Sequence, residues 1–170
     1  MKTKRMATDS ILAAICTVLA LLAIDTGTMK ITFESLPVLL GAILFGPFDG
    51  AIIGALGTFL YQILKFGITA TTVLWILPYI ACGLIVGYYS KMHKFSLSKN
   101  QLLIIILIAE LTITGFNTLA LYVDSKIYGY YTPTIISAMI FWRLGIAIAK
   151  SFAFTFVLPP VIKVGNKYGK

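Results

Sequence analysis

The chain has 170 residues, of which 59% are hydrophobic and 12% are charged, and its formal net charge is +8. Soluble domains are about 45–50% apolar and about 25% charged, so this composition excludes a water-soluble fold of the same size. The apolar runs are unbroken rather than alternating, which favours membrane helices over a β-barrel. We therefore expect an all-α membrane protein.

Six apolar segments are expected to form a bundle of six transmembrane helices. They cover residues 8–24, 36–45, 48–64, 72–89, 101–122 and 134–162. A helix needs about 20 residues to cross a bilayer. The second segment is therefore short, and either takes in neighbouring residues or bends within the bundle, where protein satisfies its backbone. The sixth must tilt, kink or protrude, and Pro159 and Pro160 are expected to end or bend it.

The N-terminus resembles a signal peptide, because a basic start precedes the first apolar segment. Asp9 interrupts that start and no small-x-small cleavage site follows, so we expect a retained helix. Two pairs of small residues lie four apart on it, which permits close helix approach and leaves open a surface for docking another membrane protein. The pairs are Ser10 with Ala14 and Ala13 with Thr17.

The stretch "GPFDGAIIGALG" between the second and third segments is rich in glycine. It lacks the Lys-Ser/Thr of a phosphate-binding loop. We expect Gly46 and Pro47 to form a turn with Pro47 at the first helical position, and Asp49 to lie in the first helical turn. The remaining glycines are expected to let this helix lie close against a neighbour. They are Gly50, Gly54 and Gly57.

Lysines and arginines in the connections predict the orientation. Counted alternately, nine fall on one side and three on the other, and the positive-inside rule places the richer side in the cytoplasm. Both the N and the C terminus are thus expected to be cytoplasmic, in a multi-pass protein of the cell (plasma) membrane. The net charge is then a topology signal rather than a nucleic-acid footprint. No repeat or linker divides residues 1–170, which are expected to form a single domain.

No motif for catalysis or metal binding is present. Cys16 and Cys82 fall inside apolar runs and are expected to be buried free thiols. The single histidine, His93, has no companion ligands and is expected to be a solvated loop residue. No ATP-binding loop or paired intramembrane acids occur. We therefore expect no enzyme activity and no cofactor or metal, and any ATP hydrolysis in a partner.

Three ionisable residues stand out inside the apolar segments, Glu110, Arg143 and Lys150, because a charge at the centre of a membrane helix costs about 2.5–3.5 kcal/mol. Glu110 and Arg143 are both expected near the membrane mid-plane, and two interpretations stay open. They form an ion pair that offsets the cost of burial, or Arg143 faces a cavity and holds an anionic solute. We expect Lys150, nearer the cytoplasm, to extend its charge toward the inner headgroups.

Polar and aromatic residues gather toward the external side. Asn117 shares a helix face with Glu110, and Trp75 and Tyr79 lie four apart. A collar of this kind above an arginine suits a flat, hydrogen-bonding ring with a carboxylate, although an interfacial aromatic belt explains the aromatic residues equally well. Lys30 and Glu34 either close over a solute or are solvated. The candidate substrate-binding residues are Arg143, Trp75, Tyr79, Asn117, Glu110 and Lys30.

The chain resembles the substrate-binding S components of energy-coupling factor (ECF) vitamin transporters in the stretch "KITFESLPVLLGAILFGPFDGAIIGALGTFLYQIL". The resemblance rests on Leu-Pro followed by Leu-Phe-Gly-Pro-x-x-Gly-x-x-x-Gly, and the length and expected topology agree with it. The folate-type members are most similar, through "FNTLALYVDSKIYGYYTP" and the Arg and Lys that follow. The stretch "FGITATTVLWILPY" departs from that type, which keeps pantothenate and other small vitamins open.

The resemblance implies a subunit that binds a vitamin, with folate expected, at the external side of the bilayer. It then docks on a transmembrane coupling subunit driven by two ATPase subunits, and topples to release the vitamin inside. The docking face of such proteins uses small residues of the first helix, which correspond here to Ala13, Ala14 and Thr17. Two rivals stay open: a self-sufficient channel or transporter for a small solute, and a structural membrane partner without a ligand.

Overall fold

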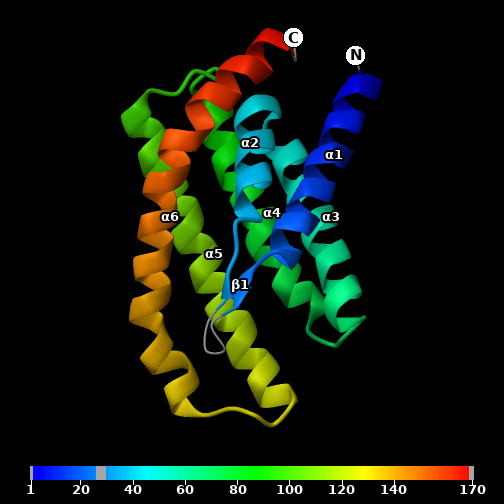
Figure 1. Ribbon diagram of the computed structural model, residues 1–170, viewed down its shortest axis with the longest axis vertical. Helices are drawn as coiled ribbons and strands as arrows, with labels where there is room; N and C mark the ends of the chain where they lie inside the picture. Colours follow the sequence, from blue (N-terminus) through cyan, green and yellow to red (C-terminus); the bar gives the residue numbers. More distant parts are fainter. Residues whose placement is uncertain (1, 26–29, 169–170) are drawn as a thin grey trace.

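A computed structural model describes residues 2–25 and 30–168, which form six helices and one short antiparallel hairpin (Figure 1). Each helix corresponds to one predicted apolar segment, although α1 ends at Leu21, before the predicted end at residue 24. The all-helical prediction is thus confirmed, whereas the hairpin was not predicted. The elements are α1 (Lys2–Leu21), β1 (Ile24–Asp25), β2 (Lys30–Ile31), α2 (Ser35–Phe45), α3 (Pro47–Phe66), α4 (Thr72–Met92), α5 (Lys99–Ile127) and α6 (Pro133–Tyr168).

Four described helices are long and apolar enough to cross a membrane: α3, α4, α5 and residues Ile140–Gly165 of α6. The 20 residues of α1 include Lys4, Arg5 and Asp9, which lower its hydropathy. With only 11 residues, α2 is buried along nearly its whole length against α1, α3, α4 and α6. Protein rather than lipid therefore surrounds its backbone, as in the interpretation that placed it within the bundle.

The connections alternate between the two ends of the bundle. Figure 1 shows the N- and C-terminal parts at the same end as the α2–α3 turn and the α4–α5 connection, which we call the terminal end. The β1–β2 hairpin lies toward the opposite end, where the α3–α4 and α5–α6 loops also lie, and we call this the hairpin end. The count of lysines and arginines on the two sides assumed this same alternation.

Glycines set the close approach of α3 to its neighbours. A Cβ at Gly50 would lie 2.5 Å from Ala42 Cβ on α2, and one at Gly54 would lie 2.6 Å from the Tyr79 carbonyl oxygen on α4. The predicted role of these glycines in helix packing is confirmed. Gly46 has a φ of +109°, which favours glycine, and α3 begins at Pro47 as predicted.

Asp49, in the first turn of α3 as predicted, also holds α1. The Arg5 Nε donates to Asp49 Oδ1 at 2.6 Å, and a second guanidinium nitrogen donates to the other carboxylate oxygen and to the Phe45 carbonyl. These contacts of Arg5 fix α1 to the α2–α3 turn at the terminal end.

Cys16 and Cys82 are buried free thiols, as expected.

Two of the four small residues of α1, Ala13 and Thr17, face α3 rather than the outside. Ala13 and Thr17 are buried, and Thr17 Oγ1 lies 2.9 Å from the Gly57 carbonyl oxygen. Ala14 is exposed. Both side chains are covered by α3 in this conformation, and the expected docking role of Ala13, Ala14 and Thr17 stays a prediction.

The last helix continues through its two prolines. Pro159 and Pro160 lie inside α6, which runs on to Tyr168, so they do not end the helix. In Figure 1 the last turns of α6 lean over the terminal end of the bundle. Close packing holds them there, since a Cβ at Gly165 would lie 2.7 Å from Leu44 Cδ1 of α2.

Candidate ligand-binding site

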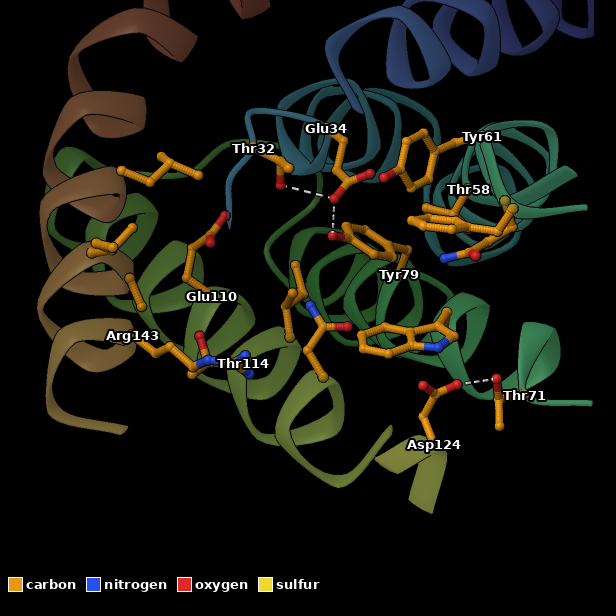
Figure 2. A pocket seen from close by; sticks show the side chains of 18 of the residues that line it. Thr32, Glu34, Thr58, Tyr61, Thr71, Tyr79, Glu110, Thr114, Asp124 and Arg143 are labelled. Atoms are coloured by element: carbon orange, nitrogen blue, oxygen red, sulfur yellow. Dashed lines mark hydrogen bonds between the residues drawn. The ribbon is translucent and has the colours of Figure 1, made fainter. Parts of the chain in front are cut away.

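A cavity of about 610 Å³ occupies the half of the bundle nearer the hairpin end. Its walls come from β2 and the segment after it, from α3 to α6, and from the α3–α4 and α5–α6 loops. Figure 2 shows Glu110 and Arg143 on one side of the cavity and Glu34, Tyr61 and Tyr79 on the other. Small-molecule sites are clefts of about 300–1,000 Å³ with a few placed polar groups, and this cavity has both properties.

The structure brings five of the six candidate residues to this one cavity. Glu110 and Asn117 line it from α5, Trp75 and Tyr79 from α4, and Arg143 from α6. For the sixth candidate, Lys30, the backbone belongs to β2 but the side chain lies outside the described part of the structure. Whether these residues bind a ligand stays a prediction.

Glu110 pairs with Lys150, not with Arg143. The Nζ of Lys150 lies 2.8 Å from Glu110 Oε2, and Ser35 Oγ donates to Glu110 Oε1 at 2.6 Å. Lys150 also donates to Ser35 Oγ at 3.3 Å. The expectation that Lys150 extends toward the inner headgroups is thus wrong, because a buried carboxylate holds its charge inside the bundle.

Arg143 is left as a cation that faces the cavity. Its Nη1 donates to Thr118 Oγ1 at 3.4 Å, and no carboxylate among the described residues forms a salt bridge with it. Figure 2 shows the half-buried side chain beside Thr114. A planar guanidinium with free donors binds a carboxylate through two parallel hydrogen bonds. The geometry therefore suits the second interpretation, in which Arg143 holds an anion.

Glu34 is a buried carboxylate of the cavity. From the sequence it was expected either to close over a solute or to be solvated. It is 6% exposed and accepts hydrogen bonds from Thr32 Oγ1 at 2.8 Å and from the Tyr79 hydroxyl (Figure 2). A salt bridge to Glu34 is absent among the described residues. Its position directly before the short buried α2 was the available signal that it is not solvated. Its remaining acceptor capacity faces the cavity, where it can receive a ligand N–H.

Asp124 joins the two loops that border the cavity at the hairpin end. It accepts hydrogen bonds from the hydroxyls of Thr71, before α4, and of Tyr130, in the α5–α6 loop. We call these three residues the loop latch. Burial, with the hydrogen bond and the charge of Asp124, raises the pKa of Tyr130 to about 12. The sequence reasoning missed Asp124 and Thr71, since nothing in their spacing shows that the loops meet.

The loop tyrosines divide between the cavity and the surface. Tyr128 and Tyr130 line the cavity. Tyr122 and Tyr131 instead contact one another edge to face, with ring centroids 5.5 Å apart, and the Lys126 Nζ lies 4.0 Å from the Tyr131 centroid. The loop tyrosines therefore form in part a cavity wall and in part a separate surface cluster.

Comparisons with known proteins agree on one family. The family model described as "ECF transporter, substrate-specific component" matches residues 4–164. A structure of the S component of a bacterial ECF transporter is similar with a TM-score of 0.67 and 20% identity, over 100% of this chain and 99% of that one. A crystal structure of FolT bound with folic acid is similar with a TM-score of 0.61 and 22% identity, over 89% and 91%. At these identities the two structures show the fold. No curated protein matches.

Proposed function

Because the chain belongs to the substrate-specific components of ECF transporters, we propose that it binds a folate-type vitamin as the S component of an ECF importer. The observation that carries this proposal is the charge arrangement of the cavity. Lys150 neutralises Glu110, whereas Arg143 faces the cavity without a carboxylate partner among the described residues. A half-buried guanidinium loses part of its hydration, which an accompanying anion offsets, and a vitamin carboxylate supplies that anion.

The opposite wall favours a folate-type ring over pantothenate. Glu34 and Asp124 present carboxylate oxygens to the cavity, and each already accepts two hydroxyl hydrogen bonds. Such acceptors suit a heteroaromatic ring with several N–H donors, and the half-buried Trp75 offers a face for stacking. Pantothenate has a carboxylate but neither an aromatic ring nor an N–H-rich edge. The similar FolT structure, which holds folic acid, supports the same choice.

In the proposed topology all six helices cross the cell membrane as one domain of residues 1–170, with both termini in the cytoplasm. The cavity then opens toward the outside, near the hairpin end. Two features support this orientation. The connections alternate between the two ends (Figure 1), and the lysine- and arginine-rich connections fall at the terminal end.

The partners in this proposal are a transmembrane coupling subunit and two ATPase subunits, which supply the ATP hydrolysis. The docking face on α1 is the outward side around Ala14, because Ala13 and Thr17 are covered by α3. Ile11, Ile15 and Val18 are exposed on the same helix. A flat apolar face with a small residue at its centre permits close approach of a partner helix.

Isothermal titration of the purified protein with a vitamin panel tests the proposed ligand. Folate is expected to bind with a Kd below about 1 µM, which corresponds to about −8.2 kcal/mol, and pantothenate to bind much more weakly. Tighter binding of another vitamin would overturn the folate assignment alone. If no vitamin binds below about 1 µM, the binding function itself is wrong.

A further inference from the structure

A second cavity lies at the terminal end, on the outside of the bundle. It has a volume of about 620 Å³ and shares no lining residue with the first cavity. We call it the α4 groove, because most of its lining belongs to the last turns of α4 (Figure 1), with the start of α3 and one face of α5 beside them. It is lined by Pro47, Phe48, Leu84, Ile85, Tyr88, Tyr89, Lys91, Met92, Ile105 and Ile108.

The groove is mostly apolar and faces away from the bundle. Leu84, Ile85 and Ile108 are all partly exposed, and so are Phe48 at 75% and Tyr88 at 64%. In the proposed membrane orientation these side chains contact lipid tails. A hollow of this kind between three helices accommodates a flexible hydrocarbon chain better than a smooth helix surface does.

One end of the groove is basic. Lys91 lines it, and the connection that follows carries His93 and Lys94, with Lys99 at the start of α5. The His93 ring stacks on Tyr89 with centroids 4.3 Å apart, which places this connection against the groove lining. The chain has no Asp or Glu from Tyr88 to Ala109. The charge at this end is therefore not compensated by nearby acids in the sequence.

From this pairing of an apolar hollow with a basic end, we infer that the α4 groove binds one anionic phospholipid of the cytoplasmic leaflet. An acyl chain lies against Leu84, Ile85 and Ile108, and the headgroup phosphate lies at Lys91. Tyr88 contributes its ring at headgroup depth, as interfacial aromatic residues do. Basic residues next to the cytoplasmic surface attract anionic headgroups. The inference rests on the proposed orientation, in which the terminal end is cytoplasmic.

Native mass spectrometry of the full chain in detergent, titrated with phosphatidylglycerol or phosphatidylcholine, tests the headgroup contact. The protein is expected to retain phosphatidylglycerol about fivefold more tightly. Lys91→Gln should remove most of this preference, whereas Lys65→Gln, a surface lysine at the hairpin end, should keep it. Equal retention of the two lipids by the wild type, or an unchanged preference in Lys91→Gln, would overturn the inference.

A second pair of variants tests the apolar part. Ile108→Trp fills the groove from an exposed position and is expected to weaken phosphatidylglycerol retention at least threefold. Leu119→Trp, at another exposed position of α5 outside both cavities, should leave it unchanged. Retention that survives Ile108→Trp would place the lipid elsewhere and contradict the inference. Folate titration of all four variants separates the two proposals, because none of these residues lines the ligand cavity.

Discussion

The Nζ of Lys150 and the Oε2 of Glu110 lie 2.8 Å apart inside the bundle, where the Lys150 side chain is 12% exposed and that of Glu110 is 2% exposed. Ser35 of α2 bridges the pair by hydrogen bonds to both. The pair thus joins α2, α5 and α6 at the floor of the cavity. It also occupies the carboxylate that the sequence analysis considered as an ion-pair partner for Arg143, which leaves the Arg143 guanidinium without a carboxylate partner among the described residues.

Breaking this pair from one side should destabilise the protein more than removing it whole. Glu110→Gln leaves Lys150 charged and buried, and we expect the free energy of unfolding to fall by about 3–5 kcal/mol. The double variant Glu110→Gln/Lys150→Met should recover most of that loss, since no unpaired charge remains. Thermal unfolding in detergent measures both. Additive effects of the two changes would mean that the residues are not coupled.

The glycine contacts of α3 and α4 predict a sharp difference between glycines. A Cβ at Gly83 would lie 2.3 Å from the Gly50 carbonyl carbon, whereas one at Gly115 would meet nothing within 4 Å. Gly83→Ala should lower the free energy of unfolding by about 1–3 kcal/mol through overpacking. Gly115→Ala is the matched control, and it should be neutral or raise stability by about 0.5–1 kcal/mol, because alanine favours helix. Similar melting temperatures of the two variants would refute the close approach of α3 and α4.

We predict that the loop latch slows the release of a bound ligand, so that breaking the latch speeds release. Tyr130→Phe removes a hydroxyl that donates to Asp124 between the two loops, and we expect bound folate to dissociate about threefold faster. Tyr131→Phe is the control, because its ring contacts Tyr122 and Lys126 instead. A fluorescence chase measures both rates. An unchanged rate in Tyr130→Phe would show that the latch does not hold the loops.

The pH dependence of the latch follows from the raised pKa of Tyr130. The ordinary tyrosine pKa is about 10, and in the folded protein it is about 12. The neutral hydroxyl is the donor, so its stabilising contribution is fully present below about pH 10 and is lost as the pH rises toward about 12. The dissociation rate should therefore be constant from about pH 6 to about pH 9. A rise in the rate within that range would contradict the assignment.

We predict that the Glu34 carboxylate makes the cavity selective for ligands that carry N–H donors. Glu34→Gln replaces a carboxylate, held by Thr32 and Tyr79, with an amide that is a weaker acceptor. We expect folate to bind at least tenfold more weakly, because a hydrogen bond to a charged group contributes about 1.5–3 kcal/mol. Folate titration of the Thr32→Val variant, alongside Glu34→Gln, separates a direct contact of Glu34 with folate from the positioning of the Glu34 carboxylate by Thr32. Unchanged folate affinity in Glu34→Gln would remove Glu34 from the site.

Much of the fold was readable in the sequence because long apolar runs specify membrane helices. The charges at Glu110 and Arg143 also marked the cavity, since an ionisable group in such a run needs a partner or an aqueous space. Their partners were not readable. Arg143 lies opposite Thr118, and Lys150, about two turns further along α6, lies opposite Glu110. That register depends on where α5 ends and α6 begins, and α5 continues to Ile127, beyond the predicted segment.

The faces of α1 show a second limit of sequence reasoning. Ala13 with Thr17 and Ser10 with Ala14 have the same small-x-x-x-small spacing, yet only Ala13 and Thr17 are buried against α3. Spacing fixes which residues share a helix face, but not toward which neighbour that face turns. Glu34 was ambiguous for the same reason, because its burial depends on contacts with α4 that are distant in sequence.

The contact between Arg143 and a ligand carboxylate is the central claim, and one thermodynamic cycle tests it most directly. Wild type and Arg143→Gln are each titrated with folate and with its dimethyl ester, which lacks both free carboxylates. The wild type is predicted to bind folate at least tenfold more tightly than the ester, since a charged hydrogen bond contributes about 1.5–3 kcal/mol, and Arg143→Gln to bind the two alike. Preference for folate that survives in Arg143→Gln would contradict the account.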